Sequence, residues 1–169
     1  MEHFGVTADI MSLAKGIASG MPLGATIAPA KIMNWEAGSH ASTFGGNPLS
    51  CQAAMATIEL LENNMMKNAA NQGKRLIESL REMQKTYECM GDVRGKGLMV
   101  AVELVKDRQT KEPATDWRSR IIKKSFEKGL LVLGCGENSI RFSPSLSVTS
   151  NEVDSGLSIF EESVREVAG

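Results

Sequence analysis

Lys15 is the first residue of this sequence whose surroundings suit a chemical role. It follows the apolar run 10–14 and precedes a glycine-rich turn. A lysine at the end of a buried strand loses hydration, which disfavours its charged form and lowers its pKa. A neutral amine is the nucleophile that forms a Schiff base with a carbonyl compound. From spacing alone, a solvated lysine at a strand end is the better explanation.

A second candidate is the segment 38–48, Gly-Ser-His-Ala-Ser-Thr-Phe-Gly-Gly-Asn-Pro. The hydroxyls of Ser42 and Thr43 lie here among flexible glycine amides, beside an expected helix N-terminus. This combination can bind a phosphate group. Neither the nucleotide P-loop pattern nor the dinucleotide fingerprint is present. A loop that ends in a helix N-cap is the plainer explanation from spacing.

Arg141 is the third candidate, between Ile140 and Phe142 in a short apolar strand that precedes Pro144. The planar fork of a guanidinium suits a carboxylate ligand. The residue pattern alone favours the alternative, a structural ion pair with a neighbouring acid.

Other catalytic and metal-binding patterns are missing from the sequence. His3 and His40 form no metal-ligand pair or catalytic dyad, and no Gly-x-Ser-x-Gly motif occurs. The three cysteines, Cys51, Cys89 and Cys135, are far apart and include no Cys-x-x-Cys. We therefore expect no metal site and no disulfide framework, which fits a reducing compartment.

The elements that must position these residues follow from periodicity and capping signals. A helix is predicted to begin at Asn47-Pro48, because asparagine caps first-turn amides and proline loses no hydrogen bond at the first helical position. Its predicted buried face holds Cys51, Met55, Ile58 and Leu61. The remaining predicted elements are a helix over 66–83, a strand over 98–105, a polar loop over 106–115, a helix over 117–126 ended by Gly129, strands over 130–133 and 139–142, and a last helix with a capping box from Thr149 to Glu152.

Residues 1–50 are rich in glycine and proline, with short apolar runs at 10–14 and 25–28. This texture is typical of buried strands and tight loops in an α/β layer. The rest of the chain alternates helices with short strands, as an α+β layer does. We therefore expect an α/β fold whose internal boundary lies within the helix that starts near Asn47.

Composition narrows the function further. The 169 residues include 19 Lys and Arg against 20 Asp and Glu, with 42% hydrophobic and 23% charged residues. These values exclude a disordered tail or a coiled coil, and the net charge of −1 argues against nucleic acid as a partner. No signal peptide is visible and no apolar run approaches about 18 residues. We expect a soluble, cytoplasmic protein without a membrane partner.

Five segments, in order along the chain, carry a family resemblance. They are 3–10 (His-Phe-Gly-Val-Thr-Ala-Asp-Ile), 13–25 with Leu-Ala-Lys-Gly and Gly-Met-Pro-Leu-Gly-Ala, 42–48 (Ser-Thr-Phe-Gly-Gly-Asn-Pro), 91–104 with Gly-Asp-Val-Arg-Gly-Lys-Gly and Val-Glu-Leu, and 140–144 (Ile-Arg-Phe-Ser-Pro). Together they resemble the class III (omega) aminotransferases, a fold-type-I family that uses pyridoxal phosphate. The stretch 129–136 gives the sequence its greatest similarity to 4-aminobutyrate aminotransferases.

The resemblance implies a role for each candidate residue. Lys15 would carry pyridoxal 5'-phosphate as a Schiff base and move the proton during amino transfer. Ser42 and Thr43 would bind the cofactor phosphate, Thr43 across a dimer interface. Arg141 would bind a substrate carboxylate, and Arg94 would be structural. The implied reaction moves an amino group from an ω- or α-amino acid to a 2-oxo acid, in a homo-oligomer.

Length is the main departure from the family, because its members are more than twice as long. Groups that the family uses are not in this sequence: an aspartate at the pyridinium nitrogen, a Gly/Ser turn at the phosphate and an aromatic residue on the ring. The resemblance therefore implies the C-terminal portion of a fold-type-I transferase. Residues 1–50 would end the cofactor-binding large domain, and residues 51–169 would form the small α+β domain, entered by a long helix. Pro144-Ser145 also replaces the family's frequent Pro-Pro.

We therefore expect the chain to be inactive alone and to need the missing N-terminal portion as a partner. Two alternatives remain open: an amino-acid racemase of the same family, and a folded fragment or subunit that does not catalyse. A racemase would scramble a single enantiomer without any 2-oxo acid.

Overall fold

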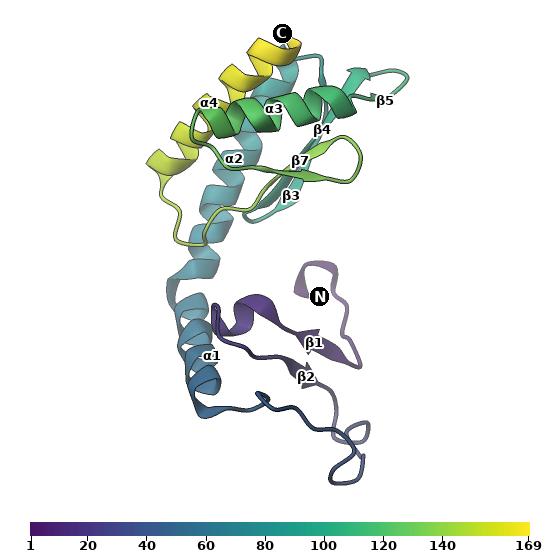
Figure 1. The fold of residues 1–169 in the computed structure, drawn as a ribbon, viewed down its shortest axis with the longest axis vertical. Coiled ribbons are helices and arrows are strands. Elements are labelled where there is room, and N and C mark those ends of the chain that lie inside the picture. The colour runs from purple at the N-terminus through teal and green to yellow at the C-terminus, as the bar shows by residue number, and fades with distance from the viewer. The chain divides into compact units, whose positions relative to one another are not determined.

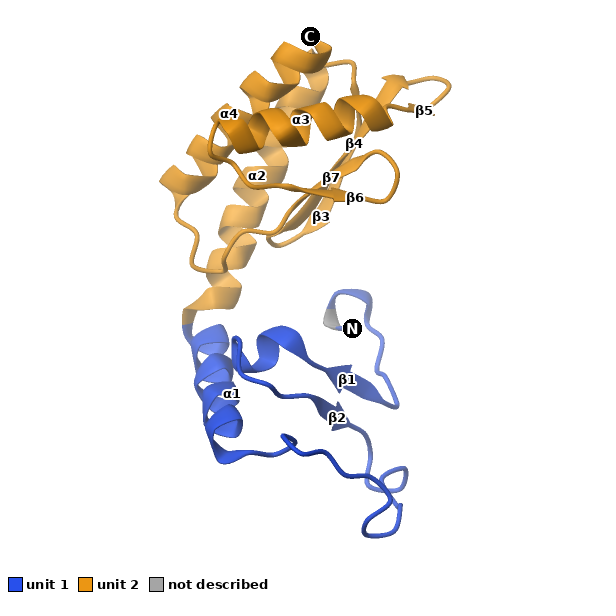
Figure 2. Cartoon of the chain, viewed as in Figure 1, with its two compact units in different colours: residues 1–63 blue, residues 64–169 orange. Residues whose placement is uncertain are grey.

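The computed structural model describes residue 1 and residues 3–169, in two compact units, 1–63 and 64–169 (Figure 2). The division falls within a helical stretch, at a π-helical turn over Leu61–Met65. Helix α1 (Pro48–Leu60) precedes this turn and helix α2 (Met66–Thr86) follows it. The sequence-based boundary between residues 50 and 51 lies earlier, inside α1. The units divide later because α1 packs against the 3-10 helix η2 of the first unit.

The first unit contains a two-stranded antiparallel ribbon beside α1. Strands β1 (Met11–Leu13) and β2 (Ala25–Ile27) pair in register, and η2 (Lys15–Ala18) follows β1 directly. The strands occur where the apolar runs predicted them, but both are half-exposed rather than buried. The burial that is typical of such strands in a larger sheet is not found within this chain, because a two-stranded ribbon has no second layer of described residues to cover it.

Helix α1 begins where the sequence predicts. Asn47 accepts a hydrogen bond from the amide of Ser50 at 2.9 Å. The buried face of α1 differs from the prediction: Ser50 and Ala54 are buried, whereas Met55 is 63% exposed and Ile58 47% exposed. Small side chains let α1 approach η2 closely, so its larger apolar side chains lie on the surface.

The second unit is built on a five-stranded antiparallel sheet (Figure 1). Its strands are β3 (Met90–Lys96), β4 (Met99–Asp107), β5 (Glu112–Pro113), β6 (Leu133–Cys135) and β7 (Ser139–Phe142). The order is β3-β4-β7-β6, with β5 paired to β4. The predicted strands at 98–105 and 139–142 are confirmed, and the predicted polar loop 106–115 includes β5.

Two features of this sheet differ from the sequence-based prediction. Strand β3 was not predicted, because its two glycines are more typical of a turn. The strand predicted over 130–133 forms instead as β6, three residues later. The physical reason is that the Leu130 amide donates to the Ser125 carbonyl at 2.8 Å and closes the preceding helix. The chain is therefore free to pair with β7 only from Leu133 onward.

Three helices cover one face of the sheet: α2, α3 (Thr115–Glu127) and α4 (Ser150–Ala168). The apolar core lies between them and the strands, where the Phe142 and Phe160 rings meet edge to face with centroids 5.0 Å apart. The predicted capping box of α4 is confirmed. The Glu152 amide donates a hydrogen bond to the Thr149 hydroxyl at 3.3 Å. The Thr149 amide donates in return to the Glu152 carboxylate at 2.8 Å. No helix in the described ranges is long and apolar enough to cross a membrane.

Helix α2 approaches the sheet closely at Gly73, which faces Gly97 in the turn between β3 and β4. A β-carbon at residue 73 would overlap the carbonyl oxygen of Gly97. Gly97 itself has a positive φ of 52°, which side chains rarely tolerate. Both glycines are therefore required for α2 to contact this turn backbone to backbone.

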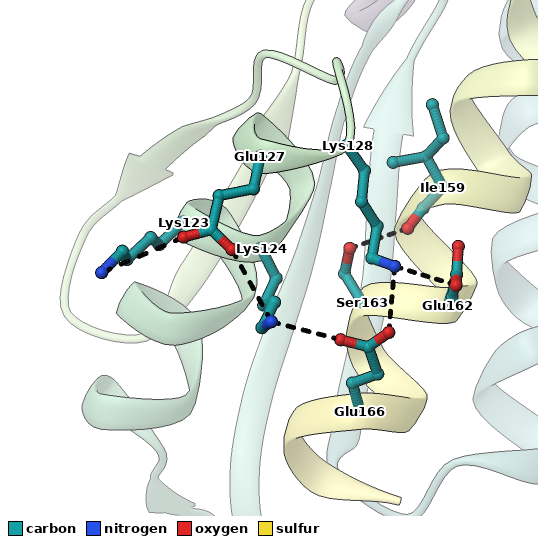
Figure 3. A network of polar contacts seen from close by, with 8 residues as sticks. All are labelled: Lys123, Lys124, Glu127, Lys128, Ile159, Glu162, Ser163 and Glu166. Carbon is teal, nitrogen blue, oxygen red and sulfur yellow. Dashed lines mark hydrogen bonds and ion pairs between the residues drawn. The ribbon is translucent and has the colours of Figure 1, made fainter.

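Ion pairs join α3 to α4 on the surface of the unit (Figure 3). Lys128 Nζ lies 2.8 Å from a Glu162 carboxylate oxygen and 2.9 Å from one of Glu166. Lys124 Nζ lies 3.5 Å from Glu166 and 3.6 Å from Glu127. The hydrogen bond from Lys128 lowers the pKa of Glu166, and bonds to Glu162 and Glu166 raise the pKa of Lys128.

Replacing Gly73 by alanine is expected to lower the free energy of unfolding by about 1–3 kcal/mol or more, because the added methyl group forces α2 away from Gly97. Urea denaturation followed by far-UV circular dichroism measures this change. Gly156→Ala is the matched control, since its added β-carbon makes only an ordinary contact with Leu130. The control is expected to lose no stability, and an equal loss in both variants would contradict the close-contact explanation.

Replacing Glu166 by glutamine is expected to destabilise the chain at neutral pH but not in acid. The pKa of Glu166 is lower in the folded chain than its usual value of 4.5. Its stabilising effect is therefore complete above about pH 4.5 and is lost as the pH falls through the folded pKa. Thermal melts of the wild type and Glu166→Gln across pH 3–7 should converge in acid. Glu137→Gln, on an exposed turn, is the control and should melt as the wild type does. A difference between wild type and Glu166→Gln that persisted in acid would refute the stabilising role of the Glu166 charge.

Candidate active site

Lys15 lies two residues after the end of β1, as the first residue of η2. Its φ is +55°, a left-handed conformation that is uncommon outside glycine and asparagine. Strained backbone of this kind concentrates at functional sites. The side chain is exposed, as spacing alone favoured, so Lys15 is not desolvated within this chain. No acidic side chain among the described residues pairs with its amine, which leaves Nζ available to a ligand.

The segment 42–47 forms a compact turn ahead of α1. The Gly45 amide donates to Ser42 Oγ at 3.2 Å, and Asn47 Nδ2 donates to the Phe44 carbonyl at 2.8 Å. Thr43 is exposed, and its hydroxyl forms no hydrogen bond with the part of the chain that the structure describes. The turn therefore presents a free hydroxyl next to a helix N-terminus, a combination that suits an anion.

Arg141 projects from β7 on the face opposite the core, because Ile140 and Phe142 on either side of it are buried. It stands in register with Ala101 on β4 and Leu133 on β6. It is exposed, and none of the described acidic side chains lies within ion-pair distance of it. The structural ion pair that the residue pattern favoured is therefore not found.

Arg94, in contrast, is fully engaged. Its Nη1 lies 2.8 Å from Asp92 Oδ2 and 3.8 Å from Glu103 Oε2. Its Nη2 donates to Ser139 Oγ at 3.4 Å. The hydrogen bond to Asp92 raises the pKa of the Arg94 guanidinium. These contacts agree with a structural role for Arg94. Sequence reasoning missed its acidic partners, and strand alternation would have found them had β3 been recognised.

The structure groups the candidates by unit. Lys15, Ser42 and Thr43 belong to residues 1–63, and Arg141 belongs to residues 64–169. Each unit therefore contributes its own chemistry: an unpaired amine with hydroxyl and amide donors in the first, and an unpaired guanidinium in the second.

Comparisons with known proteins agree with this set of groups. The family model described as aminotransferase class-III matches residues 1–164. The chain is 40% identical to a leucine/methionine racemase of Thermococcus litoralis, over 99% of this chain and 38% of the racemase. It is 40% identical to an acetylornithine aminotransferase of Caldanaerobacter subterraneus, over 98% of this chain and 40% of the relative. It is 41% identical to a 4-aminobutyrate aminotransferase of Mycobacterium leprae, over 94% of this chain and 36% of that relative.

Solved structures show the same extent of similarity. A Bacillus anthracis aminotransferase superposes with a TM-score of 0.91 and 32% identity, over 98% of this chain and 40% of that structure. An amine transaminase from an uncultivated Pseudomonas species was solved with pyridoxal phosphate bound. It superposes with a TM-score of 0.89 and 36% identity, over 98% of this chain and 40% of that structure. The chain thus spans about 40% of the length of the relatives it matches.

These similarities confirm the expected fold class, the C-terminal portion of a fold-type-I transferase. They also confirm the resemblance to 4-aminobutyrate and acetylornithine aminotransferases, and they imply pyridoxal phosphate as the cofactor. The assignment of residues 1–50 and 51–169 to a large and a small domain stays a prediction. The chain belongs to the class III aminotransferase family.

Proposed function

We propose that this chain supplies part of the active site of an aminotransferase that moves an amino group from an ω- or α-amino acid to a 2-oxo acid. The observation that carries the proposal is Lys15, an unpaired lysine on strained backbone directly after a strand, in a chain of the class III family. A lysine amine is the group that pyridoxal-phosphate enzymes use to hold their cofactor.

The residues present fit pyridoxal phosphate, a phosphorylated aldehyde. The amine of Lys15 suits the aldehyde, and the free hydroxyl of Thr43, with the turn amides beside it, suits the phosphate. Ser42 supports this turn by accepting from the Gly45 amide. When bound, pyridoxal phosphate supplies an electron sink for the substrate carbon that loses a proton. In this proposal Lys15 Nζ accepts that proton and returns it.

Arg141 has the geometry of a carboxylate-binding residue. Its guanidinium is exposed and unpaired on the open face of β7. A carboxylate could accept two parallel hydrogen bonds from its fork. Such a residue would orient amino-acid and 2-oxo-acid substrates through the group that both share.

The proposal also holds that the site is incomplete in this chain. The relatives extend well beyond the matched region. In the first unit Leu49, Met55 and Leu60 are more than half exposed, as expected of a helix that packs against further protein. We propose that an N-terminal portion and a second copy cover these surfaces, in a cytoplasmic homodimer.

A racemase is the second candidate, because the similarity to the Thermococcus leucine/methionine racemase is as high as that to the acetylornithine enzyme. Incubating one enantiomer of an amino acid with the complete enzyme and no 2-oxo acid separates the two reactions. Scrambling of the stereocentre would favour the racemase, and stable configuration would favour amino transfer.

The chain alone, with pyridoxal phosphate, 4-aminobutyrate and 2-oxoglutarate, is expected to show negligible glutamate formation, because most of the family's cofactor-binding groups lie outside it. Mixing it with the N-terminal portion of a class III enzyme is expected to produce activity that Lys15→Ala abolishes. Lys31→Ala, an exposed lysine of the same unit, is the control and should keep the activity.

A second readout of this experiment does not depend on turnover. Borohydride reduction of the cofactor-loaded mixture, followed by peptide mapping, should place the label on Lys15. Label on another lysine would overturn the assignment of Lys15, and substantial activity of the chain alone would overturn the claim that the site is incomplete.

Replacing Arg141 by alanine is expected to weaken carboxylate-bearing substrates by roughly ten- to a hundredfold, since a charge-assisted bidentate contact contributes about 1.5–3 kcal/mol. Amines without a carboxylate should lose little. The measurement is kcat/KM of the mixed enzyme for 4-aminobutyrate and for a simple alkylamine. Arg120→Ala, on the exposed surface of α3, is the control. Equal losses for both substrates in Arg141→Ala would show a structural role instead.

A further inference from the structure

Two arginines stand in one row on the face of the sheet that the helices leave open. Arg94 on β3 and Arg141 on β7 are both in register with Ala101 on β4, which lies between them. The next row along the strands holds Asp92, Glu103 and Ser139, on β3, β4 and β7 in the same order. Side chains two apart on a strand share a face, so all of these groups face the same side.

The two rows contain two arginines and two acids, but both acids pair with the same arginine. Arg94 contacts both acids, Asp92 at 2.8 Å and Glu103 at 3.8 Å. Arg141 contacts neither, although its side chain is on the same face. The register alone does not account for this difference.

Glu103 is a diagonal neighbour of both arginines, because it follows Ala101 by two residues on the central strand. Diagonal pairs across neighbouring strands lie about 7–8 Å apart, within reach of long side chains such as arginine and glutamate. Asp92 differs, because it lies on β3 with the whole of β4 between it and β7. Two strand spacings amount to about 9–10 Å, so Asp92 lies one strand farther from Arg141 than Glu103 does. Glu103 is thus the nearer of the two acids to Arg141.

We propose that Arg94 is a positioning residue that keeps Glu103 away from Arg141 and so leaves the Arg141 guanidinium free for a substrate carboxylate. This inference rests on the carboxylate-binding role proposed for Arg141. Arg94 itself contacts no substrate. It holds Glu103, while Asp92 and the Ser139 hydroxyl hold Arg94 in place.

The test measures carboxylate binding directly on the 169-residue chain. Glutarate, a dicarboxylate that cannot react, is titrated while the side-chain Nε–H signal of Arg141 is followed by NMR. Removing Arg94 by Arg94→Gln is expected to weaken glutarate binding about two- to fivefold, the range expected when Glu103 forms an exposed ion pair with Arg141. Adding Glu103→Gln to that variant should restore binding, because the competing carboxylate is gone.

Asp92 provides the matched control, since Arg94→Gln with Asp92→Asn removes the same two charges. This double variant is expected to stay weaker than Arg94→Gln with Glu103→Gln, because Asp92 lies one strand farther from Arg141 than Glu103 does. Equal rescue by Asp92→Asn and Glu103→Gln would overturn the proposal in favour of a long-range charge effect. Unchanged binding in folded Arg94→Gln would also overturn it.

Two further variants keep the result interpretable. Arg94→Met retains the aliphatic stem of the side chain and replaces Arg94→Gln if the latter fails to fold. Arg141→Gln tests the proposed function separately, by calorimetry. If Arg141→Gln binds glutarate as the wild type does, the carboxylate role of Arg141 fails. If it loses binding while the Arg94 variants do not, only the positioning role of Arg94 fails.

Discussion

The backbone contact between Gly73 and Gly97 is the constraint on which the second unit depends. It places α2 directly on the turn between β3 and β4, with no side chain between the two backbones. A helix held at that distance sets the position of the hairpin, and the hairpin in turn sets the rows of side chains that continue through β4 into β7. The face that carries Arg94, Glu103 and Arg141 is therefore positioned by two glycines outside it, one in α2 and one in the turn between β3 and β4.

How much of this could be predicted depended on whether the signal was local. Helix starts were predictable, because the Asn47 cap and the Thr149–Glu152 capping box act within one turn. Strand β3 was missed, because its glycines are explained only by what they contact elsewhere in the fold. The predicted buried face of α1 was wrong for a related reason. Hydrophobicity favours burying Met55 and Ile58, but α1 packs against η2 through the small residues Ser50 and Ala54.

The candidate site shows the same limit. Residue type and the order of family motifs were enough to select Lys15, Ser42, Thr43 and Arg141. Spacing along the chain did not predict which groups surround them. Exposure of Lys15 agrees with what spacing alone favoured, whereas its left-handed backbone was not predictable from the motif. The ion pairs of Arg94 depend on pairing between strands, which no spacing along the chain reveals. Residue identity thus predicted the chemistry, and only the three-dimensional register showed which charges are already paired.

The exposed apolar face of α1 bears on how such a protein would be made. Its small residues pack against η2, while Leu49, Met55 and Leu60 lie on the surface. A ribosome releases the N-terminal part of a polypeptide first. In a full-length chain of the kind proposed, the protein that covers this face would therefore have emerged before α1 was synthesised. The helix would meet a preformed surface on leaving the exit tunnel, and its leucine and methionine side chains would spend little time in water.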